Sequence, residues 1–168
     1  MRTFIICMLL WGGLSWTERS FAQGAAPREG TTVCTFADGQ EMSLHYLQQA
    51  FNHHDEPAMG KPWMPGGSAL TLFTQTPVLL GDSVIPTGAY TVYLIPDKHE
   101  WTLIVSRNTK IGNPYDESQD LARSPMEIGT LDQPATQLTL YFAHLAPKQC
   151  NIRVDFGKTR AWVDFQEK

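Results

Sequence analysis

The C-terminal stretch Cys150–Phe165, CNIRVDFGKTRAWVDF, predicts a β-hairpin whose register can be assigned residue by residue. Two runs of alternating apolar and polar residues flank a Gly-Lys pair at 157–158, which suits a two-residue turn that begins with Gly. Pairing outward from this turn gives one nearly apolar face and one polar face, on which Arg153 lies opposite Trp162. A slip of one residue would bury charged groups, so the pattern specifies the register strongly. In this register Cys150 points toward the core.

A second hairpin is predicted near the start of the domain, where the register depends on the length of the turn. A two-residue turn at 38–39 would place Cys34 on the polar face. A three-residue loop at 37–39, with Gly39 in the left-handed region, instead places Cys34 opposite Met42. We prefer this loop because it collects the apolar side chains on one face, namely Cys34, Phe36, Met42, Leu44 and Tyr46. Both cysteines then face the core.

The rest of the chain reads almost wholly as short strands separated by Gly and Pro turn signals. The expected strands are 32–36, 40–46, 69–75, 77–80, 89–95, 101–106, 126–131, 136–143, 150–156 and 159–165. This pattern predicts an all-β fold, an antiparallel β-sandwich of about 8–10 short strands, with a jelly-roll or barrel-like closure as the alternative. Two long irregular stretches, 47–68 and 107–125, are where we expect a functional site, since long loops in compact domains usually carry function.

The length and the charge of the chain limit its domain count and its partners. A chain of 168 residues is expected to form a single domain, here over residues 31–168. The formal net charge of -4 argues against a nucleic-acid-binding protein, which normally carries a basic surface.

Residues 1–22 have the pattern of a secretory signal peptide. Arg2 supplies the positive charge, Phe4–Trp16 is mostly apolar, and the triplet at 20–22, Ser-Phe-Ala, offers a cleavage site. An apolar run of about 13 residues is too short to span a bilayer, so no stable membrane insertion is expected. We therefore expect cleavage near Ala22, a flexible leader over residues 23–30, and a periplasmic or secreted protein.

The cysteine content fits an exported protein. Removal of the signal peptide takes away Cys7 and leaves Cys34 and Cys150. Two cysteines in an exported chain are most simply explained by a disulfide bond between them. Two buried thiols are the alternative.

Several motifs along the chain resemble those of a known family. They are Thr35–Gly39, Ile85–Tyr90, Ile95-Pro96, Trp101–Ile104, Tyr115-Asp116, Asp120–Arg123 and Lys158–Arg160. In their order and spacing, these motifs are similar to those of the bacterial domain-of-unknown-function family 2911, over nearly the whole mature chain. The resemblance implies an exported β-rich domain and implies no particular activity.

One segment departs from the pattern of that family. Its members commonly carry Trp-Arg-x-Gly-x-Asn-Glu-x-Thr, whereas this chain has WMPGGSALT at 63–71. Met64, Ser68 and Ala69 thus replace the Arg, the Asn and the Glu. Whatever those polar groups do in the relatives, this chain cannot do it in the same way.

The densest cluster of possible metal ligands is His53 and His54, followed by Met59 and Met64. Imidazole and thioether ligands in an exported protein favour copper. The spacing matches no established metal motif, and a solvated polar loop with packing methionines explains the same residues.

An acidic cluster, Asp116, Glu117 and Asp120, offers oxygen ligands of the kind that calcium takes. The spacing fits no recognised calcium loop, and a solvated loop is the alternative reading.

Aromatic side chains form the remaining candidate, a ligand surface of Trp63, Tyr93, Tyr115 and Trp162. Aromatic rings on a strand face can bind a sugar or a peptide, although cross-strand packing is their commoner role. The sequence has no motif for a serine nucleophile, a phosphate loop or a zinc protease. We therefore expect a non-catalytic domain that binds an unidentified ligand or protein in the bacterial envelope. A periplasmic copper-binding protein and an uncharacterised hydrolase are the alternatives.

Overall fold

The structure, a computed structural model, describes residues 28–48, 57–110 and 114–168. These residues form eleven antiparallel β-strands and two single-turn 3-10 helices, η2 (Pro65–Gly67) and η3 (Glu117–Gln119). The strands are β1 (Arg28–Thr35), β2 (Glu41–Gln48), β3 (Leu70–Thr74), β4 (Val78–Leu80), β5 (Ser83–Ile85), β6 (Gly88–Ile95), β7 (Trp101–Ser106), β8 (Asp120–Thr130), β9 (Thr139–Ala146), β10 (Gln149–Phe156) and β11 (Thr159–Glu167). The prediction of an antiparallel all-β fold is therefore confirmed.

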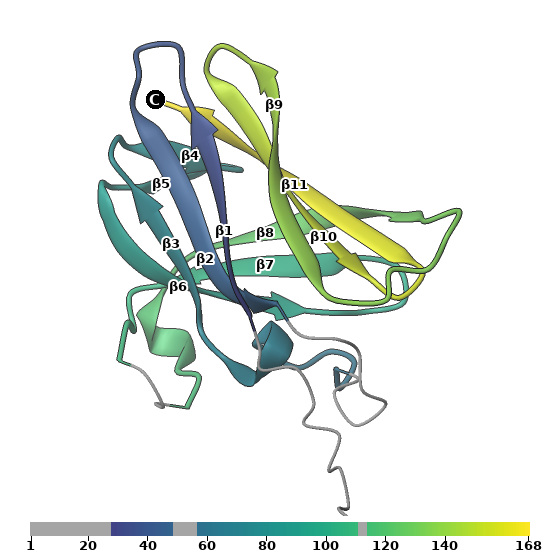
Figure 1. Cartoon of the computed structure of the whole chain (residues 1–168). Helices are drawn as coiled ribbons and strands as arrows, with labels where there is room; N and C mark the ends of the chain where they lie inside the picture. The colour runs from purple at the N-terminus through teal and green to yellow at the C-terminus, as the bar shows by residue number, and fades with distance from the viewer. Residues whose placement is uncertain (1–27, 49–56, 111–113) are drawn as a thin grey trace, which may run out of the picture.

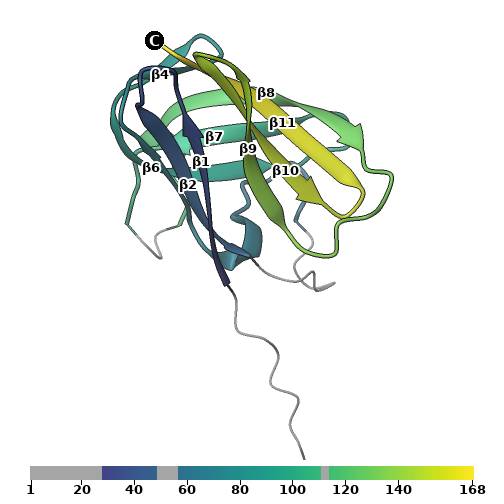
Figure 2. The same ribbon diagram turned by 45° about the horizontal axis from the view of Figure 1, so that its top comes forward.

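All eleven strands belong to one sheet, which curls until its two ends lie next to each other. Nine strands follow the order β1-β2-β3-β6-β7-β8-β11-β10-β9, while β4 pairs with β11 and with β5. Figures 1 and 2 show β1 beside β9, the strand at the opposite end of this order. Of the closures that the sequence allows, the barrel-like one describes the fold.

β8 joins the two halves of the sheet because it pairs with different strands along its length. Residues 120–126 pair with β7, where Met126 lies opposite Trp101. Residues 127–130 pair instead with β11, where Glu127 lies opposite Trp162. The first part of β8 thus lies beside β7, and its last part lies beside the C-terminal hairpin.

Both predicted hairpin registers are confirmed. In the β10–β11 hairpin, Cys150 lies opposite Phe165. In the β1–β2 hairpin, Cys34 lies opposite Met42, and Gly39 has a φ of 84° in the turn. Cys34 and Cys150 form the expected disulfide bond, with their Cα atoms 6.4 Å apart. This bond joins β1 to β10 across the line where the two ends of the sheet meet.

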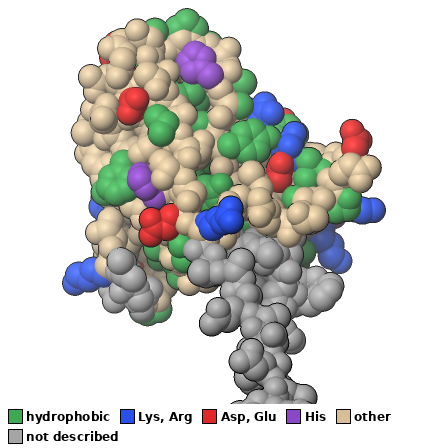
Figure 3. All heavy atoms as spheres, viewed as in Figure 1, with side chains coloured by type: hydrophobic (Ala, Val, Ile, Leu, Met, Phe, Trp, Pro, Cys, Tyr) green, Lys and Arg blue, Asp and Glu red, His purple; other side chains and the backbone are tan. Residues whose placement is uncertain are grey.

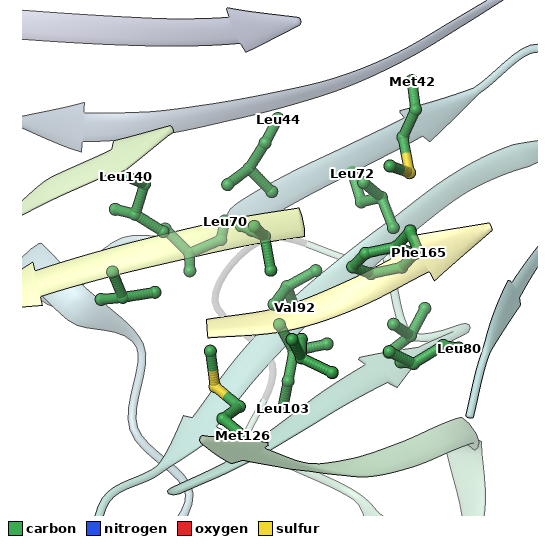
Figure 4. Packing of buried hydrophobic residues seen from close by; sticks show 14 of the residues in the cluster. Met42, Leu44, Leu70, Leu72, Leu80, Val92, Leu103, Met126, Leu140 and Phe165 are labelled. Atoms are coloured by element: carbon green, nitrogen blue, oxygen red, sulfur yellow. The ribbon is translucent and has the colours of Figure 1, made fainter. Parts of the chain in front are cut away.

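Alternating side chains cover the outside of the sheet and fill its interior. Figure 3 shows basic, acidic and hydrophobic side chains interspersed over the visible outer face. The interior is packed with large apolar side chains, which Figure 4 shows from close by; among those with 0–1% exposure are Met42, Leu44, Leu72, Leu103 and Phe165. Burial of each such side chain stabilises the fold by about 1.5–3 kcal/mol.

Several strands differ from those that the sequence predicts; β9, for example, covers Thr139–Ala146 and not 136–143. β5 is not predicted at all, because three residues are too short a run to show a pattern. β8 begins at Asp120, inside the stretch 107–125 that the sequence predicts to be irregular. Pro125 and the lack of β-branched residues make that segment a poor strand by local propensity, and pairing with β7 overrides it. β1 begins at Arg28, so the last three residues of the expected leader are in a strand, while residues 23–27 lie outside the described residues.

Across the described residues, no helix is both long enough and apolar enough to cross a membrane.

Candidate functional site

Trp63 packs at one end of the interior. Its backbone pairs with Leu94 of β6 through hydrogen bonds of 2.7 and 3.0 Å. Its indole makes edge-to-face contacts with Phe156 and Trp101, at 5.1 and 6.3 Å between ring centroids. Trp63 therefore packs against interior side chains and does not form one surface with the other three predicted aromatics, Tyr93, Tyr115 and Trp162.

Tyr93 and Tyr115 lie together over the outer face of β6. Tyr93 is only 4% exposed, and its ring meets that of Tyr115 edge to face at 5.1 Å between centroids. The Tyr115 hydroxyl donates to Asp120 Oδ2 at 2.7 Å, and Arg123 Nε donates to the same oxygen at 2.7 Å. Arg123 also donates to the Tyr115 hydroxyl and forms an ion pair with Glu117 at 3.0 Å. The network fastens the segment that carries Tyr115 to the start of β8.

The surroundings of this network hold its phenols and its guanidinium in fixed protonation states. Burial, together with the hydrogen bond and the charge of Asp120, raises the pKa of Tyr115 to about 12. Burial and the charge of Asp120 also raise the pKa of Tyr93. The hydrogen bond to Asp120 raises the pKa of Arg123. Neither the phenols nor the guanidinium is therefore poised to exchange a proton near neutral pH, as an acid or base catalyst must.

The acidic cluster predicted as a calcium candidate is tied up in contacts within the protein. Asp116 caps η3 by accepting hydrogen bonds from the backbone N–H and the hydroxyl of Ser118, at 3.0 and 2.7 Å. Glu117 and Asp120 both pair with Arg123. Each of the three carboxylates therefore already has a partner in the chain.

The predicted copper ligands are only partly within the described residues. His53 and His54 lie outside them. Met59 is 59% exposed, and Met64 is half-buried just before η2. Within the described ranges, no three His, Cys, Asp or Glu side chains come together in a way that could hold a metal ion.

A row of aromatic and basic side chains crosses the outer face of the C-terminal strands. Tyr141 of β9 lies opposite Arg153 of β10, and Arg153 lies opposite Trp162 of β11. Side chains at directly paired positions project from the same face of a sheet, so these three lie side by side. We call Tyr141, Arg153 and Trp162 the aromatic–arginine row. Glu127 of β8 follows Trp162 at the end of the row.

The position of the Trp162 indole is set by a glycine in the neighbouring strand. A Cβ atom added at Gly129 of β8 would lie 3.2 Å from Cζ3 and 3.4 Å from Cη2 of this indole. The six-membered ring therefore rests against the backbone at Gly129, as aromatic side chains often do over a glycine in a sheet. Trp162 is only half-buried, so part of the indole stays open to solvent.

The two arginines beside Tyr141 differ in how their charge is balanced. Arg160 makes a two-point ion pair with Asp155, with both N–O distances at 2.7 Å, and this contact raises the pKa of Arg160. Arg153 donates from Nε to the side-chain oxygen of Asn151 at 3.1 Å. The guanidinium carbons of Arg153 and Arg160 lie 6.0 and 5.8 Å from the centre of the Tyr141 ring, at the outer range of a cation–π contact. Among the described residues, no carboxylate lies within ion-pair distance of Arg153.

The four aromatic residues predicted as a ligand surface thus do not converge. Tyr93 and Tyr115 lie together, Trp63 lies at the end of the interior, and Trp162 belongs to the aromatic–arginine row. The sequence identifies Arg153 as the neighbour of Trp162 through the hairpin register. It does not place Tyr141 opposite Arg153, because the pairing of β9 with β10 contains a register shift near Cys150 that no local sequence pattern predicts.

The segment that departs from the family pattern lines a hollow on the surface. Ser68 and Ala69 border this hollow of about 200 Å³ together with Gly30, His45 and Tyr46. Small side chains therefore stand where the pattern has an Asn and a Glu.

Comparison with known proteins agrees with the resemblance in the sequence. A family model described as a protein of unknown function (DUF2911) matches residues 38–165. Neither a curated protein nor a solved structure gives a match to the chain. The matched range runs from the turn of the first hairpin to the last pairs of the C-terminal hairpin and so covers most of the domain. The chain therefore belongs to the DUF2911 family.

Proposed function

We propose that this protein is an exported, non-catalytic domain that binds a ligand of the bacterial envelope on the aromatic–arginine row. The observation that carries the proposal is that the charge of Arg153 has no nearby carboxylate among the described residues to balance it. Arg153 is a half-buried residue at the position between Tyr141 and Trp162, and no carboxylate of the described residues lies within ion-pair distance of it. A charge in a half-buried residue that has only neutral neighbours to balance it costs free energy, and a ligand that supplies charged acceptor oxygens offsets that cost.

The export part of the proposal is supported by the N-terminal sequence and by the cysteines. Residues 1–22 carry the pattern of a signal peptide. Cys34 and Cys150 are joined in a disulfide bond, a feature typical of proteins that fold in an oxidising compartment.

The non-catalytic part is supported by the state of the titratable groups with raised pKa values. The phenol of Tyr115 and the guanidiniums of Arg123 and Arg160 are all held by carboxylate contacts that stabilise their ordinary protonation states. Active sites usually arrange such contacts to bring a pKa toward neutrality. Here the shifts lead away from it.

Binding is tested by co-sedimentation of the purified mature protein with washed bacterial envelopes. We expect Trp162→Ala to weaken the apparent affinity for the envelopes at least about tenfold, because truncation of a central aromatic contact typically costs about 2 kcal/mol or more. The fraction of protein retained falls accordingly. Phe73→Ala is the matched control, since Phe73 is 42% exposed on the outer face of a different part of the sheet. Equal retention of the wild type and the Trp162→Ala variant would show that the row is not the binding surface.

Export is tested separately by N-terminal sequencing of protein recovered from a bacterial expression host. The expected mature protein begins at or near Gln23 and is found outside the cytoplasm. A soluble cytoplasmic protein with Met1 intact contradicts the export part of the proposal.

A further inference from the structure

We propose that the aromatic–arginine row recognises a short, extended β-linked oligosaccharide that carries a carboxylate. This inference rests on the proposed function and names the chemical class of the ligand.

The spacing of the two aromatic rings fits a sugar chain. Tyr141 and Trp162 stand on strands that are both hydrogen-bonded to β10, one on either side of Arg153. Neighbouring strands are about 4.8 Å apart, so the two aromatic positions are separated by about 10 Å, a span comparable to a disaccharide. Aromatic side chains combine a large apolar surface with little conformational freedom, which suits them to stack on the C–H faces of pyranose rings. The two rings can thus hold alternate units of an extended chain.

The charge of Arg153 indicates what the sugar unit between the two rings carries. Arg160 has its carboxylate partner in Asp155, at 2.7 Å from two nitrogens. Within the part of the chain that the structure describes, Arg153 donates a hydrogen bond from Nε to the neutral Asn151, and its terminal N–H groups donate none. A guanidinium presents its donors in a planar fork that matches the two oxygens of a carboxylate. A sugar carboxylate above Arg153 completes the same kind of pair that Arg160 already has.

The surrounding acidic groups restrict where that carboxylate can lie. Glu127 lies opposite Trp162 at the far end of the row, while the exposed Asp164 lies opposite Asn151 and accepts a hydrogen bond of 2.9 Å from Gln149 Nε2. Glu127 repels a carboxylate placed beyond Trp162, and Asp164 repels one placed over Asn151, so the favoured position is over Arg153 between the two rings. The net charge of -4 provides no long-range attraction for an anion. Affinity therefore comes from local contact, and we expect a short oligosaccharide to bind better than a long polyanion.

Two tetrasaccharides with the same β-1,4 linkage and ring stereochemistry test the binding of a sugar chain and the recognition of its carboxylate separately. Tetramannuronate carries a carboxylate on each ring, and mannotetraose carries a neutral hydroxymethyl group in its place. Isothermal titration of the mature protein is expected to show binding of tetramannuronate, and at least about tenfold weaker binding of mannotetraose, because hydrogen bonds to charged groups contribute most to such discrimination.

Variants assign that difference to particular side chains. Arg153→Gln is expected to bring tetramannuronate down to the affinity of mannotetraose, while Trp162→Leu is expected to weaken both sugars at least about fivefold. Trp162→Leu keeps an apolar side chain over Gly129, and the thermal unfolding of each variant confirms that it is folded. Arg107→Gln is the matched control, because Arg107 is exposed beyond the end of β7 and loses the same charge. It should bind as the wild type does.

Three results overturn the inference, and they can be told apart from failure of the proposed function. Equal binding of the two tetrasaccharides disproves recognition of a carboxylate but leaves a sugar-binding row intact. Equal loss of tetramannuronate binding in Arg153→Gln and Arg107→Gln shows a non-specific effect of charge. Binding of neither sugar, with envelope retention still dependent on Trp162, shows that the row binds a ligand of another class.

Discussion

The Oγ1 atom of Thr32 in β1 accepts a hydrogen bond of 2.8 Å from the backbone N–H of Phe142 in β9. These two residues belong to the strands at opposite ends of the sheet order, which share no ladder among the described pairings. A second bond, of 2.9 Å, joins the N–H of Ala37 to the carbonyl of Pro147 further along the same line. We call this line, where β1 meets β9, the seam. The two ends of the sheet are thus held together at the seam by isolated hydrogen bonds and one disulfide bond, whereas neighbouring strands elsewhere are joined by ladders of hydrogen bonds.

Removal of the Thr32 hydroxyl tests the contribution of the seam. Thr32→Val keeps the shape of the side chain and leaves the half-buried N–H of Phe142 without its acceptor. We expect a loss of about 1–2 kcal/mol in the free energy of unfolding, measured by urea denaturation. Thr31→Val is the matched control, because Thr31 is exposed and its hydroxyl hydrogen-bonds with the side chain of His45. A loss of equal size in both variants would mean that strand propensity, and not the seam, is responsible.

The disulfide bond between Cys34 and Cys150 should contribute more than any single hydrogen bond of the seam. It closes a loop of 116 residues. Loop-closure entropy for that length gives about 4–5 kcal/mol as an upper figure. Cys34→Ser and Cys150→Ser should lower the free energy of unfolding by similar amounts, and the double variant should be little worse, because all three remove the same bond. Titration of unreduced, denatured mature protein should find no free thiol; two free thiols would rule the bond out.

Gly30 is required by the ring of Tyr46 in the facing strand. A Cβ atom at this position would lie 2.6 Å from Cζ and 2.8 Å from Cε1 of that ring, closer than packed atoms can approach. We therefore expect Gly30→Ala to lower the free energy of unfolding by about 1–3 kcal/mol, the usual cost of overpacking. In the double variant Gly30→Ala, Tyr46→Leu, the shorter side chain should remove part of this penalty relative to Tyr46→Leu alone. If Gly30→Ala costs the same in both backgrounds, the clash is not its cause.

The raised pKa of Tyr115 predicts a loss of stability in alkali. The phenol has a pKa of about 12 in the folded chain against an ordinary value of 10.0, so the unfolded chain ionises first as the pH rises. The stabilisation is complete below pH 10 and disappears as the pH rises to about 12. Denaturant unfolding between pH 9 and pH 12 should therefore show a steeper loss for the wild type than for Tyr115→Phe. Parallel pH profiles of the two proteins would contradict the network around Asp120.

The sequence predicts those parts of the fold whose information is local. Gly157 and Gly39 mark the two turns, and alternation around them sets both registers, from which the inward direction of Cys34 and Cys150 follows. The switch of β8 from β7 to β11 after Met126 depends on pairing between distant segments, and no local pattern reveals it.

The same distinction explains what the sequence reveals of the candidate site. Arg153 and Trp162 can be placed side by side because one short turn connects their strands. Tyr141 joins them through a strand pair with a register shift, and Tyr93 meets Tyr115 only because the chain folds back over β6. Residues that are distant in the sequence and share no turn cannot be grouped by alternation alone.

Nuclear magnetic resonance of the tryptophan indole N–H groups tests the central claim, that the aromatic–arginine row is the binding surface, most directly. Trp63 and Trp101 contact each other and pack in or against the core, and they serve as internal controls for Trp162. On titration of the ¹⁵N-labelled mature protein with the soluble glycan fraction released from bacterial envelopes, we expect the Trp162 signal to shift saturably while those of Trp63 and Trp101 stay in place. Saturable shifts of Trp63 or Trp101 with an unchanged Trp162 signal would place the binding site elsewhere and contradict the account.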